Sequence, residues 1–300
     1  MSQTPACLID ASIYIFRYYF ALPDNWFSEE GYPTAAVYGY TTFLIDLLSN
    51  EQPEFIAAAF DESLDTCFRN EIYPDYKSSR AQPDEALAFQ LAACREVSEL
   101  LGIASFGSET YEADDLLGSL MPVLADHPEP IAVLTRDKDL GQLLRREQDF
   151  LWDKANDQRF YRPDIYDKFG VYPEQMVDYL ALVGDSIDDI PGVAGVGAKT
   201  AQALLAHGQD IIGIFEKIDE IPNLGIRGGA KLVDKLIDAS EQIAMSRALA
   251  EIICDIPLGV TANDLKLAPQ PFAPLEDFCQ RMGFPRLLNK LRQLSHIDDE

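Results

Sequence analysis

The chain has 300 residues, 47% of them apolar, which is enough for one large domain or two smaller ones with a sizeable core. It carries 24 lysines and arginines against 50 aspartates and glutamates, a net charge of −26, so a uniform surface would repel nucleic acid and DNA binding would need a local basic patch or bound cations. The absence of any run of eighteen or more apolar residues excludes a membrane span, and we expect no signal peptide.

Short apolar runs with strand character alternate with helical patterns in the first half of the chain. Strands are expected at 6–9, 55–60 and 131–135, and helices at 34–49 and 83–101. This alternation predicts an α/β domain over residues 1–170, with a mostly parallel central sheet and helices on both faces. Because ligands of such sheets bind beyond the carboxyl ends of the strands, acids that follow these strands should meet in one crevice.

The strand signal fades after about residue 160, and residues 171–300 are expected to form a mostly helical region. Helices are expected at 173–184 and 199–207, with one or two more within 232–254. The proline-bearing segment 261–274 should be a loop, and the acidic end 296–300 should be frayed.

Nine acids stand out because of their spacing. Some follow the expected strands, and others fall in clusters whose members are three residues apart and share a face of a helix or turn. They are Asp10, Asp61, Glu112, Asp114, Asp115, Asp137, Asp139, Asp185 and Asp188. A single acid at a strand end is usually a solvated loop residue or a helix cap. Several acids brought together would repel one another and resist ionising, an effect that Mg²⁺ or Mn²⁺ removes.

Such a cluster predicts phosphate-ester hydrolysis. Two divalent ions about 3.5–4 Å apart can activate a water and stabilise the leaving oxygen of a phosphodiester. A Ser-His-Asp mechanism or a histidine-rich metal mechanism is not expected, because the three histidines lie far apart in the sequence. The five cysteines include no C-x-x-C pair, which excludes a disulfide framework or zinc site and indicates a reducing cytoplasm.

The motifs around these acids resemble those of the bacterial and phage 5′-nuclease or flap endonuclease family, which includes the N-terminal nuclease domain of DNA polymerase I. The resemblance runs from residue 8 to about residue 283. Its motifs are Leu-Ile-Asp at 8–10, Phe-Asp at 60–61, Phe-Arg at 68–69, Tyr-Pro-Asp-Tyr-Lys-Ser-Ser-Arg at 73–80, Glu-Ala-Asp-Asp at 112–115, Asp-Lys-Asp-Leu at 137–140 and the run 184–201.

The resemblance implies a PIN-like or Rossmann-like fold in which the nine acids hold two Mg²⁺ or Mn²⁺ ions. It implies 5′-3′ exonuclease and 5′-flap endonuclease activity on flap, nicked or branched DNA, which leaves a 5′-phosphate and a 3′-hydroxyl, with a role in replication and repair. We expect the chain to act as a monomer. Two departures from the family pattern are Arg136, where glycine is common, and Asp189, where asparagine is common.

Basic residues and tyrosines gather in one segment of an otherwise acidic first third of the chain. Cations beside aromatic rings suit phosphates and unstacked bases, although a solubilising helix face is the plain alternative. DNA contacts are expected from Arg69, Tyr73 and Tyr76. The resemblance implies that Lys77 and Arg80 position and stabilise the scissile phosphate, and that residues 70–110 form a helical arch.

The run 190–201 predicts a helix-hairpin-helix, placed within about 182–207. Its glycines permit a tight turn, and N–H groups at the start of the next helix can meet a phosphate without reading base sequence. The expected DNA contacts are Gly195, Val196, Gly197, Ala198, Lys199 and Thr200. The resemblance implies a potassium ion held by the backbone carbonyls of Leu182, Val183, Pro191, Val193 and Val196.

Three other functions fit parts of the sequence. A non-catalytic protein that binds DNA structures would keep the hairpin, but the nine acids argue against it. A PIN-like ribonuclease shares acids at strand ends, but such domains are usually shorter and lack the hairpin. A small-molecule phosphatase would need a second acid two residues after Asp10, where this chain has Ser12.

Overall fold

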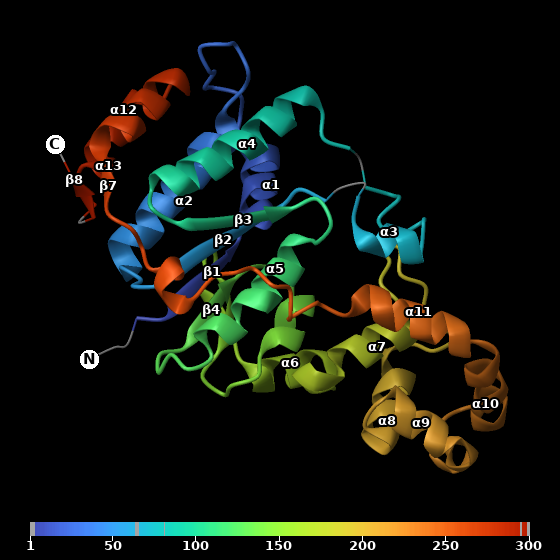
Figure 1. The fold of residues 1–300 in the computed structure, drawn as a ribbon. Helices are drawn as coiled ribbons and strands as arrows, with labels where there is room; N and C mark the ends of the chain where they lie inside the picture. The colour runs from blue at the N-terminus through green and yellow to red at the C-terminus, as the bar shows by residue number, and fades with distance from the viewer. Residues whose placement is uncertain (1–3, 64–65, 81, 295, 299–300) are drawn as a thin grey trace.

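The computed structural model describes residues 4–63, 66–80, 82–294 and 296–298 (Figure 1). In this part of the chain a six-stranded sheet runs in the order β3-β2-β1-β4-β5-β6, with β6 alone antiparallel to its neighbour. The strands are β1 Ala6–Asp10, β2 Ile56–Asp61, β3 Ala104–Ser108, β4 Ile131–Leu134, β5 Phe150–Asp153 and β6 Gln158–Phe160. The predicted mostly parallel α/β sheet is confirmed.

The central strand β1 is buried on both faces. Cys7 and Ile9 belong to one apolar cluster, and Ala6 and Leu8 belong to the other. Because successive residues of a strand point to opposite faces, a strand covered on both sides is a continuous apolar run. This is why β1, β2 and β4 were visible in the sequence.

Helices cover both faces of the sheet, as predicted (Figure 1). On one face lie α1 Ala11–Ala21, α2 Ala35–Glu51, α4 Glu85–Leu100, α12 Phe272–Arg281 and α13 Leu288–Leu291. On the other lie α5 Ala113–Leu120 and α6 Arg162–Phe169. No helix within the described ranges combines the length and the apolar character that crossing a bilayer requires.

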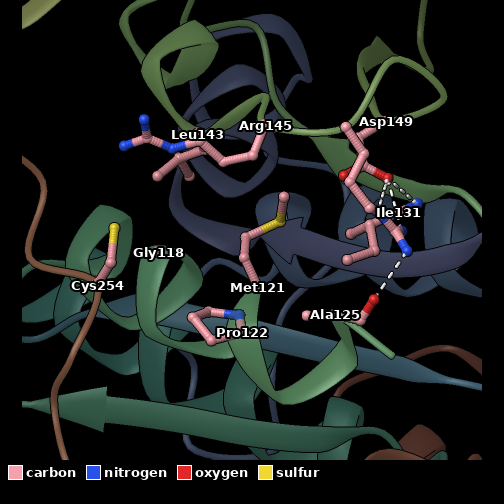
Figure 2. Close-up of a pocket in the computed structure, with 10 residues that line it drawn as sticks. Gly118, Met121, Pro122, Ala125, Ile131, Leu143, Arg145, Asp149 and Cys254 are labelled. Carbon is pink, nitrogen blue, oxygen red and sulfur yellow. Dashed lines mark hydrogen bonds and ion pairs between the residues drawn. The ribbon is translucent and has the colours of Figure 1, made fainter. Parts of the chain in front are cut away.

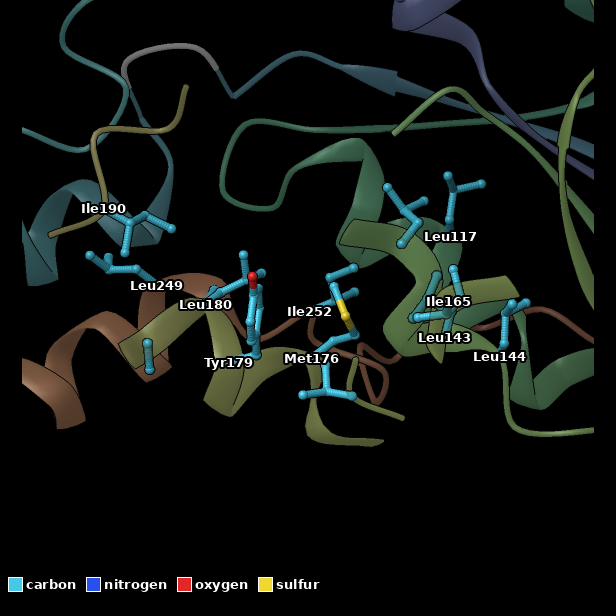
Figure 3. Close-up of a cluster of buried hydrophobic side chains, with 14 of the residues drawn as sticks. Leu117, Leu143, Leu144, Ile165, Met176, Tyr179, Leu180, Ile190, Leu249 and Ile252 are labelled. Atoms are coloured by element: carbon cyan, nitrogen blue, oxygen red, sulfur yellow. The ribbon is translucent and has the colours of Figure 1, made fainter. Parts of the chain in front are cut away.

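The second half is helical, as expected. Its helices are α7 Met176–Val183, α8 Ala198–Gly208, α9 Ile211–Glu216, α10 Gly229–Asp238 and α11 Ser240–Ala250. Figure 3 shows apolar side chains of α7, such as Leu180, beside Leu249 of α11 and continuing toward Leu117 of α5. The helical region and the sheet therefore share one core, which fixes the position of the segment after α7 relative to the strand ends.

The predicted arch over residues 70–110 is wrong in its larger part. Helix α4 is buried against the sheet layer, and β3 pairs with β2. The segment that stands off the sheet is shorter: it comprises α3 Phe68–Ile72 and the turns that follow it to Arg80. The buried residues of α4 recur every three or four positions along one face of the helix, which is the pattern of a helix packed on a core.

Two further expectations about the C-terminal part need correction. The expected loop at 261–274 contains β7 Gln270–Pro271 and the start of α12. The expected frayed end contains β8 Ile297–Asp298, which pairs in parallel with β7. Residues 299–300 lie outside the described part of the chain.

Candidate active site

A crevice opens where β1, β2 and β4 end. Asp10 is the last residue of β1, Asp61 is the last of β2, and Asp137 follows β4. Two adjoining hollows of about 150 and 30 Å³ make up the crevice. The predicted acids that line it are Asp10, Asp61, Glu112, Asp114, Asp137, Asp139, Asp185 and Asp188. The parallel sheet thus brings together eight of the nine acids from segments far apart in sequence.

The side chain of Asp10 is held by the start of the helix that follows it. Its Oδ1 accepts a hydrogen bond from the N–H of Ile13 at 3.3 Å, as an N-cap of α1, and its Oδ2 accepts one from Thr135 Oγ1 at 2.9 Å. Thr135 Oγ1 in turn accepts from the N–H of Asp137 at 3.0 Å. Sequence reasoning missed Thr135. Its signal is a hydroxyl residue at the end of an apolar run, directly before the Arg-Asp-Lys-Asp segment.

Asp185 and Asp188 lie on a turn rather than on a helix. Two backbone hydrogen bonds between Asp185 and Ile190, of 2.9 and 2.8 Å, close the turn, and Asp185 Oδ1 accepts from the N–H of Ile187 at 2.7 Å. Gly184 precedes the turn with a φ of +78°, which favours glycine. A Cβ on Gly192 would lie 2.3 Å from the carbonyl oxygen of Val183, so the chain can return past α7 only with glycine there.

Burial raises the pKa of most crevice carboxyls. It raises the pKa of Asp10 to about 7 and that of Asp139 to about 8, and repulsion from Asp137 adds to both. Burial, with Asp10 close by, also raises the pKa of Asp114 well above its usual range. These acids resist ionising together, as expected for carboxylates gathered without enough positive charge.

Two basic residues enter the crevice from the segment after α3. Lys77 Nζ lies 2.5 Å from Glu112 Oε1 and 3.5 Å from Asp188 Oδ2, and Arg80 Nη2 lies 2.6 Å from Asp188 Oδ1. Burial acts to raise the pKa of Glu112, but the charges of Lys77 and Arg69 outweigh it and lower that pKa. The predicted catalytic pair Lys77 and Arg80 therefore lies at the acids, each paired with a predicted metal ligand.

Hard carboxylate oxygens are the donors that Mg²⁺ and Mn²⁺ prefer, so the chemistry of the crevice fits these ions. Within the described ranges, however, no three His, Cys, Asp or Glu side chains are placed, as they lie, to hold one ion together. The contacts of Lys77 and Arg80 account for part of this, because they draw Glu112 and Asp188 toward cations of the chain itself.

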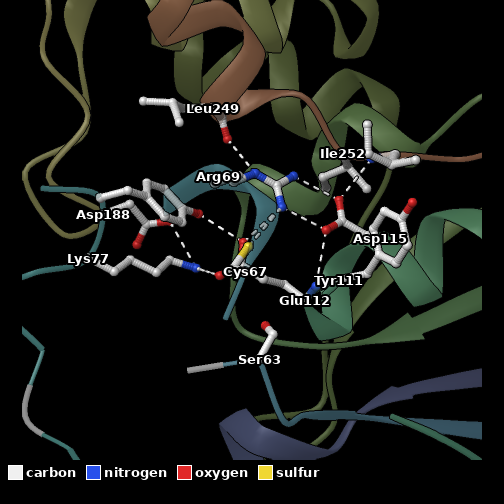
Figure 4. Close-up of polar contacts among 12 residues, drawn as sticks. Ser63, Cys67, Arg69, Lys77, Tyr111, Glu112, Asp115, Asp188, Leu249 and Ile252 are labelled. Carbon is white, nitrogen blue, oxygen red and sulfur yellow. Dashed lines mark hydrogen bonds and ion pairs between the residues drawn. The ribbon is translucent and has the colours of Figure 1, made fainter. Parts of the chain in front are cut away.

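Arg69 does not face DNA, and its predicted contact is corrected (Figure 4). It is 2% exposed, and its five N–H groups meet both oxygens of Asp115, one oxygen of Glu112 and the carbonyls of Leu249 and Glu251 at 2.6–3.0 Å. A guanidinium has only five such donors, so none remains for a phosphate. Arg69 instead ties α3 to α5 and to the end of α11.

The predicted roles of Asp115 as a metal ligand and of Tyr76 as a DNA contact are also wrong, because both side chains are buried and hydrogen-bonded within the chain. Asp115 is fully buried, and besides Arg69 it accepts hydrogen bonds from the N–H groups of Glu112 and Ile253, so it lines neither hollow of the crevice. Tyr76 is 4% exposed and donates its hydroxyl to Glu112 Oε2 at 2.9 Å, which leaves no ring face for a base. Tyr73, the remaining expected DNA contact in this segment, is half-buried, and its contact with DNA stays a prediction.

The segment after α3 is tied to the turn that carries Asp188. The N–H of Lys77 donates to the carbonyl oxygen of Asp188 at 3.0 Å, and the N–H of Ser79 donates to Asp189 Oδ2 at 2.9 Å. Asp189 has a φ of +56°, a conformation that Asn and Asp tolerate better than other residues with a Cβ. This explains how aspartate can replace the asparagine common at this position in the family that the sequence resembles.

The tip of the predicted hairpin faces solvent. Gly195, Gly197, Ala198 and Lys199 are exposed and lead into α8, whereas Val196 is buried and Thr200 is half-buried. Helices α10 and α11 hold the hairpin through its carbonyls: Lys235 Nζ donates to Ala194, Gln242 Nε2 to Gly192 and Ser246 Oγ to Pro191. The hairpin is thus presented as a preformed backbone surface.

Three of the five carbonyls predicted for potassium already accept a hydrogen bond. Leu182 accepts from the N–H of Val193, Val193 accepts from the N–H of Val196, and Pro191 accepts from Ser246. A carbonyl has two lone pairs, so one acceptor position remains on each.

The comparisons with known proteins agree with this geometry. Residues 5–170 match the family described as 5′-3′ exonuclease, N-terminal resolvase-like domain, and residues 171–272 match 5′-3′ exonuclease, C-terminal SAM fold. The chain belongs to the 5′-3′ exonuclease family, and it is a nuclease.

Relatives of this family cover nearly the whole chain. A 5′-3′ exonuclease of Aquifex aeolicus is 31% identical over 288 residues, which are 96% of this chain and 95% of that one. DNA polymerase I of Bacillus subtilis is 34% identical over 287 residues, which are 95% of this chain but 32% of the relative. The exonuclease chain thus spans about a third of the length of the DNA polymerase I relatives that it matches.

Solved structures show the same fold. The 5′-exonuclease of bacteriophage T5 with bound zinc ions has a TM-score of 0.66 at 19% identity, with 97% of this chain and 99% of that one covered. The T5 flap endonuclease in a complex with DNA and metal ions has a TM-score of 0.68 at 19% identity, with 96% and 100% covered.

The exonuclease chain also has an apolar pocket of about 260 Å³ that is separate from the crevice (Figure 2). Ile131, the first residue of β4, helps to line it, so the pocket lies at the opposite end of that strand from Asp137. Met121, Leu143 and Cys254 are other lining residues, and none of the nine predicted acids contributes. This pocket therefore takes no part in the acid chemistry.

The raised pKa of Asp139 leads to a prediction about stability. In the native chain this carboxyl keeps its proton up to about pH 8, whereas its usual value is 3.8, so stability should fall as the pH rises between these values. Asp139→Asn removes this loss. At pH 9 in EDTA we expect its melting temperature to exceed that of the wild type by about 2–4 °C, which is about 1 kcal/mol for a chain of this size.

Differential scanning fluorimetry at pH 5 and pH 9, with and without Mg²⁺, checks this prediction. The difference should be smaller at pH 5, and Mg²⁺ should raise the melting temperature of the wild type more than that of the variant. A lower melting temperature for Asp139→Asn at pH 9 in EDTA would contradict the assigned repulsion.

Proposed function

We propose that this exonuclease-family chain hydrolyses phosphodiester bonds of 5′-ended and 5′-flap DNA and leaves a 5′-phosphate and a 3′-hydroxyl. The observation that carries the proposal is the convergence of eight buried or half-buried acids with Lys77 and Arg80 at the carboxyl ends of three parallel strands. A role in replication and repair follows from these substrates.

The crevice carboxylates would hold two Mg²⁺ or Mn²⁺ ions. Asp10 and Asp61 would act from the strand ends, Glu112 and Asp114 from the start of α5, and the remaining acids from the loop after β4 and the turn after α7. Bound ions supply an activated water and stabilisation of the leaving oxygen. Asp115 is left out of this set because both of its carboxylate oxygens accept hydrogen bonds from Arg69.

Lys77 and Arg80 would bind the scissile phosphate. The charges of Glu112 and Asp188 raise the pKa of Lys77 against the opposing effect of burial, so its amine stays protonated. Where Glu112 and Asp188 bind metal, Lys77 and Arg80 would be free to contact phosphate oxygens in the same place. The positive charges of Lys77 and Arg80 would then offset the negative charge that develops on the phosphate.

The hairpin would bind the duplex part of the substrate. Exposed N–H groups at the start of α8, with Lys199 beside them, suit a phosphate at a helix N-terminus. A potassium ion on the carbonyls of Leu182, Val183, Pro191, Val193 and Val196 would add to this contact. We propose that the chain acts on DNA as a monomer in the cytoplasm.

A cleavage assay on matched substrates tests the proposal. The purified chain is incubated with a 5′-flap, a nicked duplex and a single strand, each as DNA and as RNA, with Mg²⁺, with Mn²⁺ or with EDTA. We expect metal-dependent cleavage of the DNA flap, and DNA ligase should seal the nick that cleavage leaves, because that step needs a 5′-phosphate and a 3′-hydroxyl.

Two outcomes would replace the proposal. Binding of flap DNA without cleavage in either metal would favour a non-catalytic DNA-structure-binding protein. Faster cleavage of the RNA flap than of the DNA flap would favour a PIN-like ribonuclease.

A further inference from the structure

The apolar pocket at the start of β4 has the size and the surface of a ligand site (Figure 2). Its walls come from the end of α5 and the turn after it, from residues 143–149, which lead to β5, and from the segment that carries Cys254. An apolar cavity of about 150 Å³ is large enough to hold benzene. At about 260 Å³, this pocket therefore has room for a larger ring system or a short acyl chain.

Two of the charged residues in its lining, Arg146 and Asp149, are paired with each other. Arg146 Nε lies 3.1 and 3.0 Å from the two carboxylate oxygens of Asp149, which is 1% exposed. The other donors of this guanidinium meet Asp149 again and the carbonyls of Ala125, His127 and Glu129 at 2.7–3.2 Å. All five N–H groups of Arg146 are thus engaged, and none remains for a ligand.

Arg145, the next charged lining residue, is different. Its side chain is exposed, and among the residues that the structure describes no hydrogen bond or ion pair engages its guanidinium. Asp149, the acid in the pocket lining, is held by Arg146. A guanidinium presents a planar fork of donors that matches a carboxylate or a sulfonate. Apolar walls beside this guanidinium fit an apolar body that carries an anionic group.

We propose that this pocket binds a small anionic amphiphile, whose rings or acyl chain lie against Met121, Leu143 and Cys254 and whose carboxylate or sulfonate meets Arg145. The pocket lies at the opposite end of β4 from Asp137, and none of the crevice acids lines it. The inference therefore goes beyond the proposed nuclease function and does not rest on it. Binding needs neither a divalent metal nor DNA.

The thiol of Cys254 provides a direct measure of occupancy. It is half-buried, whereas the other four cysteines are buried, so N-ethylmaleimide should label Cys254 first, and peptide mass spectrometry identifies the labelled residue. The probe is 1-anilinonaphthalene-8-sulfonate, which joins an apolar ring system to an anion and whose fluorescence gives Kd. At a concentration of about ten times Kd it should slow the labelling about tenfold, because only the empty pocket reacts.

A neutral analogue of the probe, N-phenyl-1-naphthylamine, tests the role of charge. It keeps the ring system and lacks the sulfonate, so the wild type should bind it more weakly. Arg145→Gln should raise Kd for the anionic probe about 3–10-fold and leave Kd for the neutral analogue unchanged. Arg286→Gln is the matched control, because it removes the same charge from an exposed arginine outside the pocket, and both Kd values should match the wild type.

Cys254→Phe tests the cavity itself. The larger side chain enters the pocket from its half-buried wall and should weaken the binding of both compounds. A melting temperature close to that of the wild type shows that the variant is folded, and the protection of Cys254 in the wild type gives the same information without any substitution.

Three outcomes would overturn the site. Unchanged labelling of Cys254 at saturating probe would place the binding elsewhere on the chain. Equal Kd values of the anionic probe for the wild type and for Arg145→Gln would remove the anion from the ligand class. Labelling that slows with rising protein concentration in the absence of probe would assign the pocket to a second copy of the chain. Cleavage of DNA enters none of these measurements, so the nuclease proposal stands or fails separately.

Discussion

Asp114→Ala should abolish cleavage of a 5′-flap DNA, with a loss of about three orders of magnitude or more in the single-turnover rate. The residue lines both hollows of the crevice, and burial together with Asp10 raises its pKa. A ligand of a metal pair supplies several kcal/mol of stabilisation to the reacting phosphate, and each 1.36 kcal/mol is about tenfold in rate. Because the native carboxyl is repelled by its neighbours, its removal should leave the chain folded or slightly more stable.

Quenched-flow cleavage with Mg²⁺, together with a melting curve, measures both effects. Asp234→Ala on α10 is the matched control, because it removes the same charge from an exposed residue outside the crevice and should cleave as fast as the wild type. Wild-type activity in Asp114→Ala would rule out the two-metal assignment.

Arg69→Ala should lower the free energy of unfolding by about 3–5 kcal/mol, because it leaves the buried carboxylate of Asp115 without its charged partner. The variant also leaves the carbonyls of Leu249 and Glu251 without a donor. Urea denaturation followed by tryptophan fluorescence measures the loss. DNA affinity should change only through the fraction of unfolded chain.

The double variant Arg69→Met/Asp115→Leu separates the ion pair from simple packing. Apolar residues of similar size should recover much of the stability that Arg69→Ala loses, because no unpaired charge remains. The opposite pattern, in which Arg69→Ala keeps full stability but binds DNA weakly, would restore the DNA contact predicted from the sequence.

Asp114 and Asp115 show why the sequence could not assign every acid. They are neighbours in one motif, and both carry a carboxylate at the start of α5. Successive helix residues point about 100° apart, so Asp114 faces the crevice while Asp115 faces Arg69 in the core. Which direction is which depends on how α5 is rotated against β1 and β2, and that rotation is set by packing.

The same limit applies to the elements of the fold. The runs that became β1, β2 and β4 are apolar along their whole length and were predicted. β3 has the sequence Ala-Ser-Phe-Gly-Ser and is half-buried, and β6 is a short edge strand, so neither shows the run of a buried strand. Helix α4 was predicted as a helix but placed in an arch, because its apolar positions do not say what covers them.

The amino-acid sequence by itself determined the α/β class, the acids at the strand ends and the glycine hairpin, because strand burial, metal-ligand chemistry and backbone freedom are local properties. Only the tertiary structure decided which charges face one another. Arg69 and Tyr76 share a basic, aromatic segment with Lys77, yet packing against α5 and α11 buries the first two against Glu112 and Asp115. A buried charge must take a partner from whichever segments the fold brings to it, and those lie up to 182 residues away in this chain.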